Sequence, residues 1–223
     1  MEGALKVARK YHFANGEPKR ERVIACSRAF HGRTLATLSA GDSDKYREGF
    51  GPRPGGFEHV PFGNLNELRA AMGDDVAAIV IEPVQGEGGI FPADYTYLHG
   101  LREAADEFGA LLVFDEVQCG MGRTGTLHAI EQEGISGDLQ TIAKGLGAGY
   151  QPIGAILVSK KIDDAIANGS GFFQHGHTYQ GHATACAAAL ATQRAIRDRD
   201  LLGNVVKQGE NLVAALEAKL GQH

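Results

Sequence analysis

The sequence predicts an α/β fold, with helices on both faces of a mainly parallel, doubly wound sheet. Short apolar runs alternate with amphipathic runs along the chain, which is the order expected of right-handed βαβ units. Runs such as AAIVIE and LLVFDEV are apolar throughout, as is typical of strands buried on both faces of a parallel sheet. Glycine supplies 31 of the 223 residues without any repeat, which fits sharp turns and close ligand contacts between such strands.

Composition excludes several classes of protein. The formal net charge of −5 offers no basic field for nucleic acid or an anionic membrane. No apolar run reaches the roughly 18 residues that a membrane span needs, and Met1–Lys10 lacks the apolar core of a signal peptide. Cys26, Cys119 and Cys186 are far apart with no CxxC, which disfavours a disulfide scaffold or a zinc cluster. We therefore expect a cytoplasmic protein.

The elements follow from periodicity and from the stop signals between them. Strands are expected at Arg22–Cys26, Ala78–Glu82, Leu111–Val117, Leu139–Ile142 and Ala155–Val158. Helices are expected at Leu65–Met72, Tyr95–Phe108, Ile162–Ala167 and Gly181–Arg199, with further helical patterns before Asn15 and from Leu202 onward. The Gly/Pro-rich segment 41–63 is expected to be irregular, and loops of that length are usually functional. The first helical pattern has no preceding cap residue and the last apolar helical face runs to the end of the chain, so a piece of a longer polypeptide is expected.

Three polar residues mark the expected carboxyl ends of strands, where open α/β sheets bind ligands. They are Glu82, Asp115 and Lys144, and the last two are 29 residues apart, which leaves room for one βαβ crossover. Pyridoxal phosphate needs a lysine for its Schiff base and an acid to keep its pyridine nitrogen protonated. Lys144 lies between the apolar runs TIA and GLGAG, where loss of hydration would favour the neutral, nucleophilic amine. The alternatives are an aspartate that caps a helix or pairs with an arginine, and a solvated lysine.

Two other motifs are weaker candidates. Gly120–Gly125 is a literal GxGxxG, but the acidic pair before it would repel a pyrophosphate and no periodic helix clearly follows, which disfavours a dinucleotide site. His175, His177 and His182 resemble a metal cluster without carboxylate partners. We expect these histidines to donate hydrogen bonds within a loop and expect no metal site.

Six motifs run along the chain in the order ALKVAR, AFHGRT, IEPVQGEGG, FDEVQCGMGRTG, TIAKGLGAG with PIGA, and HTYQGHATACAAAL. Together they resemble the large domain of class III (ornithine/acetylornithine/4-aminobutyrate-type) pyridoxal-phosphate aminotransferases. The resemblance implies the fold-type-I architecture, a three-layer α/β/α sandwich with a mostly parallel sheet. It also implies that residues 1–199 are a pyridoxal-phosphate-binding large domain truncated at its N-terminus. Residues 200–223 would then start a helix leading to a missing C-terminal small domain.

The resemblance assigns roles to the residues that match its motifs. Lys144 would form the internal aldimine and then act as the general base between the substrate Cα and the cofactor C4′. Asp115 would pair with the pyridinium nitrogen, and Gln118 would hydrogen-bond the phenolic oxygen of the ring. Val117 and Phe30 would pack on its two faces; their alternative is ordinary packing within the core.

Three further residues complete the implied site. Thr178 would donate to the cofactor phosphate across a dimer interface, which implies a homodimer with shared active sites. Glu82 would support the site, and Glu87 resembles a glutamate that pairs with a mobile arginine; its alternative is a loop acid near a helix start. The family's phosphate-binding turn before ALKVAR and the small domain's carboxylate-binding arginine are missing, so turnover by this chain alone is not expected.

The implied reaction is transfer of an amino group, such as an ω-amino group, to a 2-oxo acid. FGPRPGGFEHVPFGNL resembles acetylornithine-type members, whereas AKGLGAGYQPIGA and HGHTYQGHATA resemble the broader ω-aminotransferases. The amino donor therefore stays open. Alternatives are a pyridoxal-phosphate-dependent mutase or decarboxylase of the same fold, a catalytically silent dimerisation domain, and a nicotinamide-binding domain built on GMGRTG.

Overall fold

The computed structural model describes residues 1–221, and its centre is a six-stranded sheet with the order β2-β1-β3-β6-β7-β8. The strands are β1 (Arg22–Cys26), β2 (Phe57–Val60), β3 (Val76–Ile81), β6 (Leu111–Asp115), β7 (Leu139–Ile142) and β8 (Ala155–Val158). The first five strands of this order run parallel, and β8 pairs antiparallel with β7. A separate two-stranded hairpin is formed by β4 (Val84–Gln85) and β5 (Phe91–Pro92).

Seven α-helices are formed within the described residues. They are α1 (Glu2–Ala14), α2 (Leu35–Ala40), α3 (Leu65–Ala71), α4 (Tyr95–Phe108), α5 (Lys160–Gly169), α6 (Ala183–Asp198) and α7 (Leu201–Leu220). Short 3-10 helices lie at Asp44–Tyr46, Ala129–Glu133 and Lys144–Leu146.

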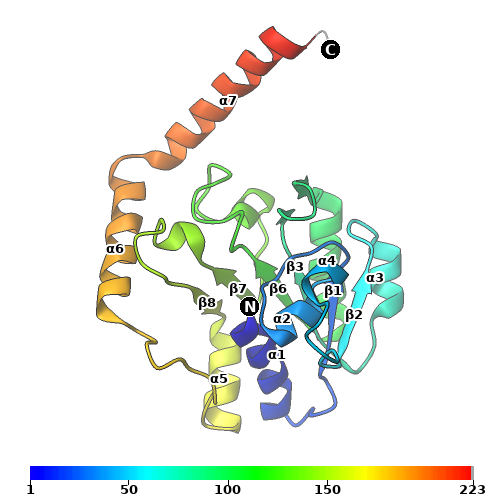
Figure 1. The fold of residues 1–223 in the computed structure, drawn as a ribbon. Helices are drawn as coiled ribbons and strands as arrows, with labels where there is room; N and C mark the ends of the chain where they lie inside the picture. Colours follow the sequence, from blue (N-terminus) through cyan, green and yellow to red (C-terminus); the bar gives the residue numbers. More distant parts are fainter. Residues whose placement is uncertain (222–223) are drawn as a thin grey trace.

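Helices cover both faces of the sheet, which gives three layers (Figure 1). On one face, α3 and α4 pack on a core that includes Ile79 and Ile81 of β3. On the other face, α1 and α5 pack on a core that includes Ala78 and Val80 of the same strand. Every residue of β3 is buried, because successive side chains of a strand point to opposite faces and both faces are covered. The predicted α/β class with a mostly parallel sheet is confirmed.

The structure differs from the sequence-based expectation mainly at the edge of the sheet that β2 forms. The segment 41–63 is not irregular throughout, because it contains β2, which pairs in parallel with β1. The run FEHV gives no clear strand signal since three of its four side chains are only partly buried. Helix α2 was also not expected. The strand expected at Leu111–Val117 ends at Asp115, where the backbone N–H of Val117 turns back to donate to the Asp115 carboxylate.

Helix α6 runs along one side of the molecule, and α7 projects from it at the top of Figure 1. Gln193 of α6 donates to the Leu146 carbonyl oxygen at 3.1 Å, which ties α6 to the short helix that begins at Lys144. The two helices are separated at Asp200, whose φ of 48° is left-handed. This break adjoins the boundary expected between residues 199 and 200, although residues 222–223 lie outside the described part. None of the helices in residues 1–221 combines the length and apolarity required to cross a membrane.

Candidate functional site

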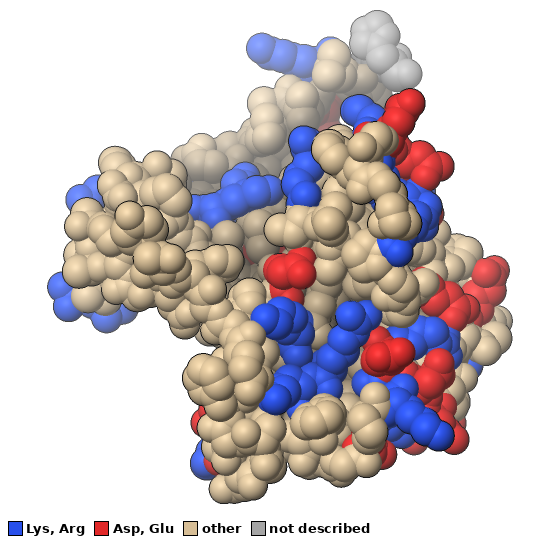
Figure 2. Space-filling view, turned by 60° about the horizontal axis from the view of Figure 1, so that its bottom comes forward, with Lys and Arg blue, Asp and Glu red and all other residues tan. Residues whose placement is uncertain are grey.

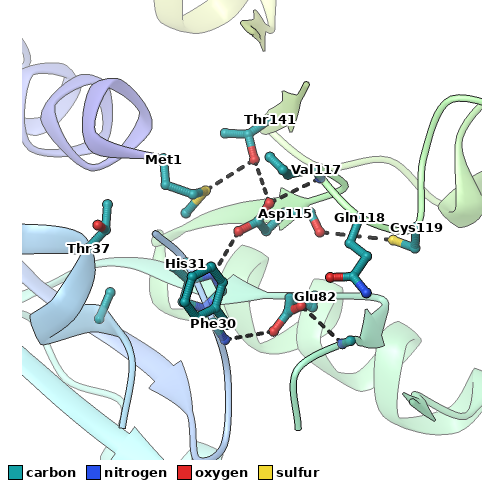
Figure 3. Close-up of polar contacts among 12 residues, drawn as sticks. Met1, Phe30, His31, Thr37, Glu82, Asp115, Val117, Gln118, Cys119 and Thr141 are labelled. Atoms are coloured by element: carbon teal, nitrogen blue, oxygen red, sulfur yellow. Dashed lines mark hydrogen bonds and ion pairs between the residues drawn. The ribbon is translucent and has the colours of Figure 1, made fainter. Parts of the chain in front are cut away.

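Polar residues converge where the parallel strands end (Figure 3). Phe30 and His31 lie in the loop after β1, Glu82 follows β3, and Asp115 ends β6. Thr141 belongs to β7, and Lys144 comes two residues after that strand. The structure therefore brings Glu82 and Asp115, two of the three strand-end residues selected from the sequence, to one edge of the sheet with residues from the neighbouring strands. A hydrogen bond to Gln118 joins Lys144 to the same edge.

Asp115 is a buried carboxylate with three hydrogen-bond donors around it (Figure 3). Its Oδ2 accepts from His31 Nδ1 at 2.8 Å, and its Oδ1 accepts from Thr141 Oγ1 at 2.9 Å and from the Val117 N–H at 3.1 Å. Burial alone would raise the pKa of Asp115, but the His31 hydrogen bond, its charge and the other two donors outweigh burial. The pKa of Asp115 is therefore below its ordinary value, and the carboxylate is ionised at neutral pH.

His31 and Thr141 both donate to Asp115, and sequence reasoning did not select either of them. His31 lies within the AFHGRT motif but was not assigned a role, and Thr141 is a buried polar residue near the end of a strand. The motif around His31 and the polar Thr141 at a strand end are visible in the sequence. Which carboxylate these residues contact, however, depends on the order of strands in the sheet. His31 Nε2 is buried without a hydrogen-bond partner among the described residues, so Nδ1 is the nitrogen committed to Asp115.

Lys144 and Gln118 meet on the solvent side of this edge. Lys144 Nζ lies 3.4 Å from Gln118 Oε1, in position to donate a hydrogen bond. Lys144 has a left-handed φ of 41°, a conformation that non-glycine residues adopt rarely and mostly where surrounding structure enforces it. The side chain is exposed, so the loss of hydration expected from its apolar neighbours is not found: the backbone turns Lys144 outward while Thr141 and Ile142 stay buried.

A glycine makes room for Gln118. A Cβ on Gly86 would overlap the Gln118 carboxamide, so the amide keeps this position only because residue 86 has no side chain. The amide therefore lies in a narrow space beside Lys144.

Glu82 connects two of the loops that surround the site. It is only 4% exposed; its Oε1 accepts from the Phe30 N–H at 2.9 Å and its Oε2 from the Gly86 N–H at 3.2 Å. Burial raises the pKa of Glu82, and these two backbone hydrogen bonds counteract the shift in part. Glu82 thus fixes the loop that carries Phe30 relative to the turn that adjoins Gln118.

The Phe30 ring belongs to a second group of side chains on this edge. Its edge contacts Tyr46, with ring centroids 5.5 Å apart. The Arg33 guanidinium lies 4.6 Å from the centroid of Tyr46 and 5.8 Å from that of Phe30. The Tyr46 hydroxyl donates to the carboxylate of Glu87, which is otherwise exposed. The sequence selected Phe30 and Glu87, but not the tyrosine and arginine that link them.

The remaining selected residues are less closely connected. Val117 is half-buried and contacts Asp115 through its N–H. Thr178 is exposed in the loop between α5 and α6, and no hydrogen bond within residues 1–221 joins its side chain to the residues above.

The two weaker motifs occupy loops. The GxGxxG segment leads into the short 3-10 helix Ala129–Glu133, and the Glu116 carboxylate accepts from the Ala129 and Ile130 N–H groups at 2.7 and 2.9 Å. That carboxylate therefore caps the first turn of this short helix. The His175 and His177 rings lie 5.3 Å apart, but no cluster of three metal-ligating side chains forms in the described part of the chain.

The chain is similar to known proteins along its whole length. The family model described as Aminotransferase class-III matches residues 1–223. The chain is 46% identical over 219 residues to acetylornithine aminotransferase of Xanthomonas axonopodis pv. citri, covering 97% of this chain and 52% of the relative. The corresponding enzyme of Methanocaldococcus jannaschii is 45% identical over 216 residues, covering 97% and 53%. The chain spans about half the length of the curated relatives it matches.

A solved structure extends the similarity to the fold. An amine transaminase from an uncultivated Pseudomonas species, solved in a PLP-bound (internal aldimine) form, superposes with a TM-score of 0.92 at 36% identity, covering 100% of this chain and 56% of that one. A family match over the whole chain, relatives above 40% identity and this superposition lead to one conclusion: the chain belongs to the class III aminotransferase family.

Proposed function

We propose that the protein is a pyridoxal-phosphate-dependent aminotransferase that transfers an amino group, such as the ω-amino group of an acetylornithine-like amine, to a 2-oxo acid. The observation that carries the proposal is the convergence of Asp115, Gln118 and Lys144 at the carboxyl ends of neighbouring strands. Family membership supports the reaction class, and the names of the relatives support the donor.

The side chains present fit pyridoxal phosphate. A buried, ionised carboxylate suits a protonated ring nitrogen, because buried charges are stable when they are paired. The Gln118 carboxamide can donate to a phenolic oxygen, and the overlap that a Cβ at Gly86 would cause supports a narrow slot for that amide. When bound, pyridoxal phosphate supplies a carbonyl carbon that reacts with amines and a ring that accepts electron density.

Each residue then has a task that its surroundings support. Lys144 Nζ would hold the cofactor and, as a free amine, would take and return the proton of the substrate Cα. Gln118 Oε1 accepts from Lys144 Nζ and so orients the amine. His31 and Thr141 are positioning residues that keep Asp115 ionised. Val117 and Phe30 would pack against the two ring faces, with Glu82 holding the loop of Phe30 in place.

Two charged residues, Arg33 and Glu87, contact the Tyr46 side chain next to Phe30. Arg33 is an exposed guanidinium beside Phe30, and guanidinium groups bind carboxylates in bidentate fashion. The Glu87 carboxylate accepts a hydrogen bond from the Tyr46 hydroxyl. In that position it could pair with a cation on the substrate or on the protein. We assign both residues to substrate recognition.

The complete protein is proposed to be a cytoplasmic homodimer with shared active sites. Thr178 is exposed and makes no hydrogen bond to the site within residues 1–221, which supports a role in the site of a second copy. Residues 1–199 would form the cofactor-binding domain and residues 200–223 the connection to a further domain. Three cysteines without a disulfide fit a reducing compartment.

The test is a visible absorption spectrum after addition of pyridoxal phosphate. A yellow band that borohydride bleaches is expected for the wild-type chain. The same band is expected for the control variant Lys160→Ala, which removes an exposed lysine at the start of α5. The band should be absent from Lys144→Ala. An unchanged band in Lys144→Ala, or no band in a wild-type chain extended to the length of its relatives, would contradict the proposal.

A further inference from the structure

A groove of about 420 Å³ lies on the side of the molecule opposite the candidate site. It is formed by α1, by the segment that leads into the amino end of β1, and by the loop after α5, whereas the candidate site lies at the carboxyl ends of the strands. Figure 2 turns the lower ends of α1 and α5 forward and shows Lys and Arg side chains gathered on this face. The side chains that matter most are Lys6, Arg9, Lys10, Phe13, Arg20 and Phe173.

The groove is positively charged in a protein that is negatively charged overall. Four cationic side chains line it together with one carboxylate, Glu21, for a formal charge of +3, against −5 for the chain. Arg20 pairs with Glu17 at 3.3 Å. Within residues 1–221, no carboxylate lies within 4.0 Å of the charged groups of Lys6, Arg9 or Lys10. The positive charge of the groove is therefore largely uncompensated by the protein itself.

Backbone carbonyl oxygens hold three of these cations in place. Lys6 Nζ donates to the Gln174 carbonyl at 2.6 Å, Arg9 Nε to the Glu21 carbonyl at 2.8 Å, and Arg20 Nη1 to the Phe108 carbonyl at 3.0 Å. Such hydrogen bonds orient a side chain without neutralising its charge. A ligand bound between these groups would pay less conformational entropy than one bound by free side chains, since the cations are already fixed.

Two aromatic rings add apolar surface beside the charges. Phe13 is 58% exposed, although it is a large apolar side chain, and Lys10 Nζ lies 5.2 Å from its ring centroid. Phe173 forms the other wall, with Lys6 Nζ 5.9 Å from its centroid. Each ring is thus paired with a cation, an arrangement that offers a flat apolar contact and a positive charge within the same few ångströms.

We propose that this groove binds a small organic anion that carries two or more negative charges and a flat apolar part. Its volume falls within the range of small-molecule sites. The negative charge of the whole chain disfavours a long polyanion, which would contact much more of the surface. The proposal does not depend on the aminotransferase function, because the groove shares no residue with that site.

Titration calorimetry with adenosine 5′-monophosphate as the probe tests the proposal on the intact chain. The nucleotide combines a phosphate dianion with a flat ring system, whereas adenosine lacks the charge and inorganic phosphate lacks the ring. The nucleotide is expected to bind about tenfold or more tightly than either control, since stacking on an aromatic side chain and charge pairing both contribute. Equal affinity for the nucleotide and either control would overturn the proposal.

Three variants locate the binding. Lys10→Glu is expected to weaken nucleotide binding about fivefold or more through charge reversal, and Phe13→Ala about threefold or more through loss of stacking. Lys207→Glu makes the same charge change on α7 and should leave the affinity unchanged. Phe13 and Lys207 are exposed and Lys10 is partly buried at the surface, so unchanged thermal unfolding curves are expected to show intact folds. Unchanged nucleotide affinity in both Lys10→Glu and Phe13→Ala would overturn the proposal. An equal loss of affinity in Lys207→Glu would also overturn it, as would a loss that occurs only in Lys144→Ala.

Discussion

At the scale of single residues, the charge of Asp115 results from a competition between burial and hydrogen bonding. Burial favours the neutral acid, whereas His31, Thr141 and the Val117 N–H favour the carboxylate. His31 contributes the largest of the favourable effects. Removal of the imidazole should therefore shift the balance towards burial, with consequences for both stability and its dependence on pH.

We predict that His31→Leu lowers the free energy of unfolding at pH 7 by about 1.5–3 kcal/mol, the usual contribution of a hydrogen bond to a charged group. In the wild type, the pKa of Asp115 is below its ordinary value of about 3.9, so its stabilisation is present above that pH and is lost as the pH falls through the folded-state pKa. In His31→Leu, burial is expected to raise the pKa of Asp115. The difference in the free energy of unfolding between wild type and variant should therefore shrink as the pH falls from 7 to 5.

Urea unfolding at pH 7 and pH 5 measures this difference. His99→Leu is the matched control, because His99 is a partly buried histidine whose Nε2 contacts a neutral carbonyl, that of Glu133, at 3.0 Å. The loss of unfolding free energy in His99→Leu is subtracted from that in His31→Leu at each pH. If the remaining loss is the same at pH 7 and pH 5, the charge of Asp115 does not depend on His31.

The residues of the site differ in how far the sequence alone could select them. Glu82 and Asp115 interrupt apolar strand patterns, so their position at strand ends is visible in the sequence. The partner of His31 is not visible, because β1 and β6 become close only through β3, which lies between them in the sheet. The exposure of Lys144 could not be predicted either, since it depends on a left-handed backbone conformation that an apolar sequence context does not encode.

Among the elements, the strands that are buried on both faces were predictable and the edge strand β2 was not, although β8 at the opposite edge was also expected from the sequence. β3 and β6 are apolar at nearly every position because helices cover both of their faces. β2 pairs only with β1, and its Glu58 side chain binds Arg22 of the neighbouring strand. Such a strand is held by cross-strand pairs whose partners are distant in sequence, so FEHV carries little periodic signal.

Helix α4 offers an element-scale prediction through its N-cap. Asp94 accepts a hydrogen bond from the Tyr97 N–H at 2.8 Å, and α4 buries Leu98 and Leu101 against the sheet. Asp94→Ala should lower the free energy of unfolding by about 1 kcal/mol. Asp94→Asn should lower it much less, because asparagine is also a good N-cap residue. Chemical denaturation measures both, with Asp74→Ala, an exposed aspartate without a capping hydrogen bond, as the control. Equal effects of Asp94→Ala and Asp74→Ala would show that the cap contributes nothing.

At the scale of the whole molecule, α7 stands apart from the two cores that stabilise the sheet. The helix has no buried residue, yet Leu212, Val213 and Leu216 are apolar and 60%, 55% and 47% exposed. Contiguous apolar surface of this kind promotes association. We therefore predict that the chain self-associates and that α7 is responsible.

Sedimentation velocity over a range of protein concentrations tests this prediction. The wild-type sedimentation coefficient should rise with concentration, while the double variant Leu212→Lys, Leu216→Lys should sediment as a monomer throughout, because positions four residues apart share one helix face. Glu210→Lys changes the net charge by the same amount on the same helix and leaves the apolar residues in place, so it should associate like the wild type. Loss of association in Glu210→Lys would assign the effect to charge, and a wild-type chain that stays monomeric at every concentration would show that the exposed face of α7 does not bind a second copy.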